Sequence, residues 1–266
     1  MLLVNHLMLW LDATTSANLG AFVLIALIGG VVRGATGFGG ALVMILPLAA
    51  IYSMPQAIAI SISLELFGPL FLIWAAVKRV YSHALASQIL KQFIFWSVLG
   101  LPIGLIAQGS LDSNLVGMIA STAIAFMVLM MLIGAHRSLP RVSSRVARGL
   151  GLACGSLIAL TGIGGPLAAT YFLNEIKEPA LMRSMMHLYA TAMSVATISL
   201  MLGFGFVGMN LLPALAVGLP IYIGATLLGQ HLTSLISAER LRLVILLFIL
   251  ASSGVYLLRF LPLELV

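Results

Sequence analysis

Long apolar stretches recur along almost the whole chain and leave no room for a soluble domain between them. Eight can be placed between Pro, Gly or charged residues, at about 19–51, 55–77, 92–108, 114–135, 148–173, 181–203, 211–229 and 240–258. An α-helix needs about 20 apolar residues to cross a hydrocarbon core of about 30 Å. The stretches therefore predict an all-α polytopic integral membrane protein, with a single transmembrane domain over residues 1–266.

The composition fits a lipid environment. Hydrophobic residues make up 62% of the chain and charged residues 8%, against about 25% charged in an ordinary soluble domain. The net charge of +6 does not indicate a nucleic acid partner. Lys and Arg residues of membrane proteins gather in cytoplasmic loops, where they fix the orientation of the protein in the membrane. Cys154 is the only cysteine, which excludes an internal disulfide and a cysteine-built metal site. We expect no metal and no cofactor.

Short motifs recur in the same order in the two halves of the chain. TGFGG begins at Thr36 and TGIGG at Thr161, GLPI occupies 100–103 and 218–221, and a helix-opening proline recurs as Pro55 and Pro179. Shared order at this spacing indicates a tandem duplication. We place repeat 1 at about 18–135, a basic cytoplasmic loop at 136–148 and repeat 2 at about 149–260.

The distribution of Lys and Arg distinguishes two topologies. If all eight segments cross completely, eight Lys and Arg residues lie inside and four outside. If the two segments that contain TGFGG and TGIGG are instead re-entrant hairpins, each made of two half-helices, eleven Lys and Arg residues lie inside and Arg259 alone lies outside. The positive-inside rule favours this second arrangement. Each half then consists of one hairpin and three complete crossings. Because three is an odd number, the second half enters the membrane from the opposite side, and the two repeats are inverted. Inverted repeats are a recurrent transporter architecture. The alternative is that the glycines only permit close helix packing.

The Gly-rich breaks are the candidate substrate site. Opened backbone cannot face lipid, and the helices that restart near Gly39 and Gly164 would point free N–H groups and positive dipole ends into the membrane centre. That geometry suits an anion. The two threonines either contact the substrate or cap the half-helices. The predicted substrate-binding residues are Arg33, Thr36, Gly37, Gly39, Gly40, Thr161, Gly162, Gly164 and Gly165.

Few ionisable side chains lie within the apolar segments. Arg33 is either a charge partner for an anionic substrate, an ion pair with Glu65, or a side chain that snorkels to the outer surface. Glu65 is either a proton-coupling carboxylate or that partner of Arg33. Aligning the two helix-opening prolines places Tyr189 opposite Glu65, and His187 two residues before Tyr189. His187 is a candidate proton relay or a hydrogen-bonded structural residue.

The segments GATGFGGALVMILPL and LTGIGGPLAATYF resemble the sulfite exporter TauE/SafE family of membrane transporter proteins. The resemblance covers about Gly20 to Leu258 and includes the later GLPI segments. Phe172 stands where Pro47 would repeat. The family motif falls on Gly34, Thr36, Gly37, Gly39, Gly40 and Pro47, and on Thr161, Gly162, Gly164, Gly165 and Pro166.

This resemblance implies a secondary transporter that exports small sulfur-containing anions, such as sulfite or organosulfonates, across the bacterial cytoplasmic (inner) membrane. Proton coupling and a homodimer are expected by the same analogy. A passive anion channel is the main alternative, and a non-transporting scaffold is disfavoured because scaffolding does not require broken helices. An intramembrane enzyme is also disfavoured, since GxSxG and HExxH are absent. We expect no catalytic residues.

Overall fold

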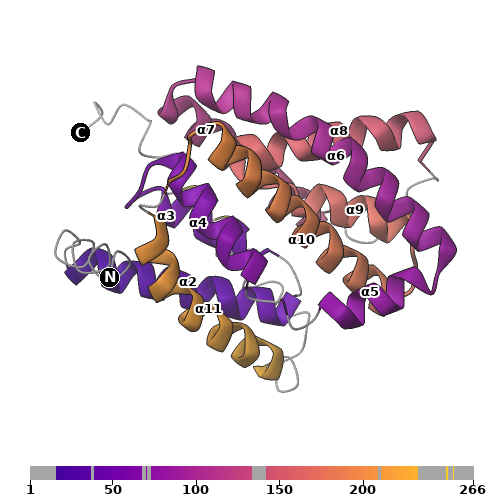
Figure 1. Ribbon diagram of the computed structural model, residues 1–266, viewed down its shortest axis with the longest axis horizontal. Helices are drawn as coiled ribbons and strands as arrows, with labels where there is room; N and C mark the ends of the chain where they lie inside the picture. The colour runs from indigo at the N-terminus through magenta and orange to yellow at the C-terminus, as the bar shows by residue number, and fades with distance from the viewer. Residues whose placement is uncertain are drawn as a thin grey trace.

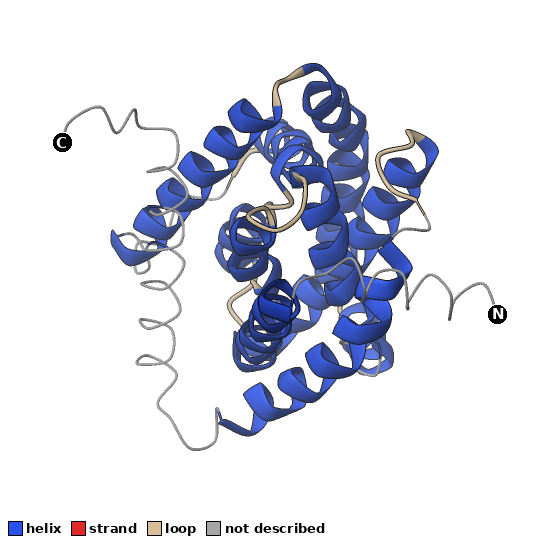
Figure 2. Ribbon diagram, turned by 90° about the vertical axis from the view of Figure 1, so that its left-hand side faces the viewer, coloured by secondary structure: helices blue, strands red, loops and turns tan. Residues whose placement is uncertain are grey.

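Every regular element that the structure describes is helical. The computed structural model describes residues 16–36, 39–67, 70, 73–133, 142–208, 211–232, 250 and 254, and no strand occurs in them (Figure 2). Most of the predicted stretch 240–258 lies outside these residues. In chain order the helices are α2 (Ser16–Thr36), α3 (Gly40–Leu48), α4 (Met54–Phe67), α5 (Ile73–Tyr81), α6 (Ala84–Ser110), α7 (Ser113–Ile133), α8 (Ser144–Thr161), α9 (Gly165–Glu175), α10 (Pro179–Gly203) and α11 (Leu212–Leu232).

Both predicted breaks are present. Gly39 precedes α3 with a φ of 87°, and Gly162 follows α8 with a φ of 75°. Left-handed backbone of this kind is accessible to glycine without the steric cost that a Cβ imposes. The Gly162 N–H closes the last turn of α8 by donating to the Ile158 carbonyl at 2.8 Å. Glycine therefore ends one helix and allows the next to start in a new direction.

The first helix of each broken segment is longer than a half-helix. At about 1.5 Å per residue, the 21 residues of α2 span about 30 Å, the full thickness of the hydrocarbon core. α8 begins at Ser144 rather than at the predicted 149, because the Ser143 side chain caps it by accepting from the Val146 N–H. Both first helices are thus longer than half the thickness of the hydrocarbon core, and the re-entrant path remains a prediction.

Two close helix pairs flank a central group of helices. α2 packs along α11 on one side and α6 along α8 on the other, with α3, α4, α9 and α10 between them (Figure 1). Glycines let the backbones touch: a Cβ on Gly34 would overlap the Thr226 carbonyl, and a Cβ on Gly155 would overlap the Ser97 carbonyl. Each GLPI helix therefore packs on the helix before the break of the other half. This exchange fits the predicted duplication, while the inverted sense remains a prediction.

The surface of the bundle is apolar, as a bilayer requires. Among the described residues, four helical segments are long and apolar enough to cross a membrane, namely Asn18–Ala35, Ala84–Ser110, Pro179–Gly203 and Leu212–Leu232. Shorter apolar helices cover Met54–Phe67 and Asn114–Phe126. Trp74 is 81% exposed, and Phe95 and Phe126 are also exposed. Soluble monomers rarely expose contiguous apolar surface of this kind. The chain is a multi-pass helical membrane protein.

Candidate functional site

The N-terminus of α3 is surrounded by polar groups from three other helices. The Ala41 N–H donates to Glu65 Oε1 of α4 at 2.8 Å. A Cβ on Gly40 would lie 2.9 Å from the Gly29 carbonyl of α2 and would overlap the Tyr222 hydroxyl of α11. Only glycine leaves room for this approach. The first break thus presents the positive end of α3 to the half-buried carboxylate of Glu65 and to the buried phenol of Tyr222.

Arg33 is buried beside this site without a hydrogen-bond partner. Its side chain is 2% exposed, and none of its guanidinium nitrogens has a partner in the described part of the chain. It therefore does not snorkel to a surface. The predicted alternative of an ion pair with Glu65 also receives no support, because no hydrogen bond joins the two side chains and the carboxylate binds the α3 backbone instead.

Two further side chains lie within electrostatic reach of Arg33. Tyr222 is fully buried, its hydroxyl has no partner among the described residues, and both Glu65 and Arg33 act on it electrostatically. His187 of α10 is likewise within the field of Arg33, and its Nδ1 has no partner in the same set. The sequence analysis missed Tyr222. Its position directly after the second GLPI motif is the signal that could have found it.

The second break is built differently. Tyr189 donates to Ser97 Oγ at 3.1 Å and lies 3.0 Å from Cys154 Sγ, and Cys154 donates to the Gly164 carbonyl at 3.1 Å. Gly162 packs against Ile45 of α3, so this break contacts the helix that follows the first one. The predicted alignment pairs Glu65 with Tyr189, and in the structure each of these side chains lies beside the break of its own half. A role of Tyr189 in proton coupling remains a prediction.

The structure separates the predicted site residues into two groups. Arg33, Gly39, Gly40, Glu65 and His187 belong to the surroundings of the first break. Thr161, Gly162, Gly164 and Gly165 belong to the second, together with Tyr189. Gly37 and the side chain of Thr36 lie outside the described residues.

Thr161 uses its hydroxyl within its own helix, so its removal should hardly affect transport. The hydroxyl is buried and donates to the Leu157 carbonyl at 2.7 Å. We expect Thr161→Ala to keep the half-saturation concentration of the transported anion within about threefold of wild type, since a neutral hydrogen bond contributes only about 1 kcal/mol. Flux measured in proteoliposomes against anion concentration checks this. A tenfold or greater rise would show that the hydroxyl also contacts the anion.

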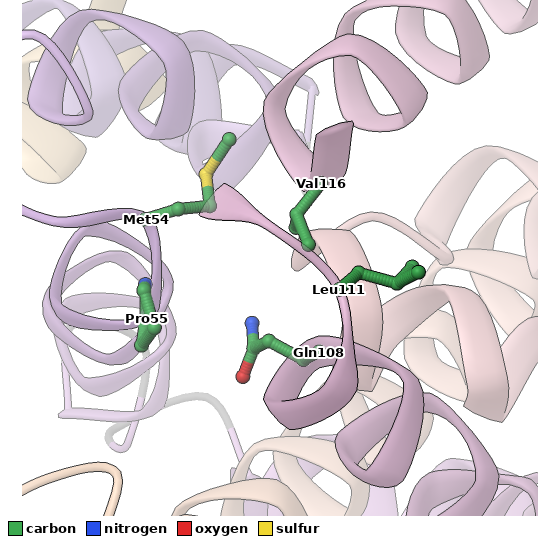
Figure 3. Close-up of a pocket in the computed structure, with 5 residues that line it drawn as sticks. All are labelled: Met54, Pro55, Gln108, Leu111 and Val116. Carbon is green, nitrogen blue, oxygen red and sulfur yellow. The ribbon is translucent and has the colours of Figure 1, made fainter. Parts of the chain in front are cut away.

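A small cavity adjoins the second break. It has a volume of about 60 Å³ and is lined by Met54, Pro55, Gln108, Leu111 and Val116, with the Gln108 amide directed into it (Figure 3). Gln108 Nε2 donates to the Leu160 carbonyl at 3.3 Å. A space of this size holds a few water molecules beside the Gln108 amide.

No group of three His, Cys, Asp or Glu side chains forms a metal site within the described ranges. The polar groups of the first break instead provide backbone N–H groups, a guanidinium and a phenol, which are donors suited to an oxyanion. The model of the family described as sulfite exporter TauE/SafE matches residues 22–257. The chain belongs to this family. No curated protein and no solved structure matches it significantly.

Membership of the TauE/SafE family makes the chain a membrane transporter of the sulfite or sulfonate type and not an enzyme. Its environment is the lipid bilayer and its substrate a small anion. The predicted resemblance is thereby confirmed over nearly all of the chain. Five motif glycines of this TauE/SafE protein lie at the two helix breaks, namely Gly39, Gly40, Gly162, Gly164 and Gly165.

Proposed function

We propose that this TauE/SafE protein is a proton-coupled secondary exporter of small anions, most closely of sulfite or organosulfonate type, in the bacterial inner membrane. The single observation that carries the proposal is the buried guanidinium of Arg33, which has no partner in the described part of the chain. A buried cation is costly unless it is paired. A transported anion supplies the missing partner.

The surroundings of Arg33 favour an oxyanion. The N-terminus of α3 and the Tyr222 hydroxyl meet at Gly40 and offer N–H and O–H donors. Donors of this kind, held away from water, stabilise an oxyanion strongly. Arg33 adds a planar set of N–H groups that matches the oxygens of sulfite or a sulfonate. Carboxylates share part of this geometry, so acetate is the informative comparison substrate.

Glu65 and His187 are the two candidate proton carriers of this proposal. Both are ionisable, and both lie within electrostatic reach of Arg33 or of a group that Arg33 affects. A pair of titratable groups beside an anion site is the arrangement from which transporters build proton relays. The proposal extends to a homodimer by family analogy, which size measurement in detergent tests independently of transport.

Reconstituted protein should move sulfite and an alkanesulfonate uphill when a pH gradient is imposed. Radiolabelled anion is placed on both sides of proteoliposomes at equal concentration, and its accumulation is followed after an acid or alkaline jump outside. Acetate tests selectivity, and protein-free vesicles measure leakage. Flux that only dissipates an existing anion gradient would identify a passive channel, and absence of flux for every anion would reject the proposed function.

A further inference from the structure

Glu65 occupies the position in which an anion would bind to α3. Its Oε1 accepts from the Ala41 N–H at 2.8 Å, in the first turn of a helix of nine residues that has no side-chain cap. The positive end of a helix attracts anions in general. The carboxylate therefore takes the place of a free anion at this helix end. An arriving anion and the carboxylate require the same N–H group.

The unpartnered donors at this helix end indicate that a second anion can replace the carboxylate. The Tyr222 hydroxyl is fully buried beside Gly40 and has no hydrogen-bond partner within the described residues. Arg33, 2% exposed, is equally unpartnered there. Buried polar groups almost always have partners. One unpartnered donor beside Gly40, and a second in the electrostatic field of that donor, point to a ligand that binds there in addition to the Glu65 carboxylate or in its place.

Charge balance decides how the exchange occurs. Without a ligand, Arg33 and Glu65 give the site one positive and one negative charge. Addition of a monovalent anion to this pair would leave an uncompensated negative charge away from water, which is costly. Transfer of one proton from solvent to the Glu65 carboxylate restores neutrality. The carboxyl group, now uncharged, is a weaker acceptor for the Ala41 N–H. The anion then takes over both the N–H and Arg33.

We propose that Glu65 is an internal competitor of the transported anion, so that the site binds one anion only together with one proton on Glu65. This inference rests on the proposed function and specifies its coupling. Anion and proton move in the same direction, and a monovalent anion crosses without net charge. The anion gradient and the pH difference together then set the flux of a monovalent anion, and the membrane potential does not. Where the interior is more alkaline, the pH difference favours entry, so export by this route is driven by the outward anion gradient.

The titratable groups that face Glu65 come from few elements. Tyr222 of α11 lies in the electrostatic field of both Glu65 and Arg33. α10, which packs on α4, carries Arg183, His187 and Tyr189, and both Arg33 and Arg183 act on His187. The sequences of α3 and α7 contain no titratable residue. Glu65 is thus the only carboxylate among these groups, and His187 is the other proton acceptor that the experiment has to separate from it.

The first test measures protons directly on the wild-type protein. Ethanesulfonate serves as the probe because it stays a monovalent anion over the range from about pH 5.5 to 8.5 in which Glu65 is tested. Binding in weakly buffered detergent solution should take up about one proton per anion where Glu65 is ionised, and the dissociation constant should rise about tenfold per pH unit there. Binding without proton uptake overturns the inference.

Three variants assign the proton. Glu65→Gln resembles the protonated form, so its affinity for ethanesulfonate should match the acid-limit affinity of wild type at every pH, without proton uptake. His187→Gln should retain the uptake, and Glu178→Gln, at an exposed position, is the matched control. Proton uptake that persists in Glu65→Gln, or that is lost in His187→Gln, overturns the inference.

A backbone variant tests the shared N–H itself. Ala41→Pro removes the donor that Glu65 uses, and Pro166 stands at the corresponding place after the second break, in the first turn of α9, where proline is well tolerated. Affinity for ethanesulfonate should fall about tenfold or more, in line with the loss of a charge-assisted hydrogen bond. Unchanged affinity overturns the shared-donor arrangement.

The outcome separates the coupling from the transport function. If wild-type vesicles carry no anion, the proposed function fails and the competition is rejected with it. If they carry anions and imposed membrane potential alters ethanesulfonate accumulation as strongly as the pH gradient does, transport stands and the internal competition is rejected. Accumulation that follows the pH difference alone supports both.

Discussion

Arg33→Met is expected to abolish saturable anion flux and, at the same time, to raise the melting temperature of the purified protein. The guanidinium is 2% exposed and has no hydrogen-bond partner in the described residues, so the ligand-free protein bears the cost of burying its unsatisfied N–H donors. Methionine fills similar space without that cost. Loss of a buried charge partner weakens anion binding by about 2–5 kcal/mol, or about 30-fold to several thousand-fold.

The two readouts together distinguish a binding residue from a structural one. Arg145→Met removes a charge at an exposed position in α8 and should change neither flux nor melting temperature appreciably. If Arg33 were part of a structural ion pair, the methionine variant would melt at a lower temperature and lose flux only through unfolding. Lower stability with normal flux would remove Arg33 from the mechanism altogether.

Gly155→Ala should destabilise the protein more than any other single methyl addition in α8. Its Cβ would overlap the carbonyl of Ser97 and lie 2.6 Å from that carbonyl carbon. Backbone cannot rotate away as a side chain can, so α6 and α8 must separate. Overpacking costs about 1–3 kcal/mol or more, which exceeds the gain of about 1 kcal/mol in helix propensity. Melting temperature and the yield of monodisperse protein measure the effect.

Gly149→Ala in the same helix is the matched control. Gly149 is exposed, and a Cβ there would meet nothing within 4 Å. Alanine should leave the stability unchanged or raise it by up to about 1 kcal/mol. Equal melting temperatures for the two variants would mean that α6 and α8 do not pack as closely as the structure has them.

Local chemistry made much of the fold predictable. Apolar length predicted the helices, and glycine clusters predicted where two of them break, because lipid excludes unpaired backbone and glycine alone adopts left-handed angles without cost. Pro179 correctly marked the start of α10. The length of α8 was predicted less well, because the cap at Ser143 lies in a polar segment that the apolar pattern does not register.

Membership of the TauE/SafE family could also be argued from the sequence. So could the choice of Arg33 and Glu65 as candidate site residues, because an ionisable residue in an apolar segment is rare at any position. The hydrogen-bond partners of these two residues could not be predicted from the sequence. The sequence suggested an ion pair between Glu65 and Arg33, whereas in the structure the Glu65 carboxylate accepts a hydrogen bond from the Ala41 N–H. A carboxylate binds the donor that lies within hydrogen-bonding distance. The packing of α3 against α4 decides which donor that is.

The sequence by itself determined a membrane-embedded helical chain with two glycine breaks and isolated charges within its spans. Only the tertiary structure brought α11 against α2, and with it Tyr222 to the N-terminus of α3. Hydrophobic length and glycine conformation act within a few residues and can be recognised in a single segment. The surroundings of a buried charge are assembled from helices distant in sequence, because in lipid it is close packing and hydrogen bonding that select helix partners.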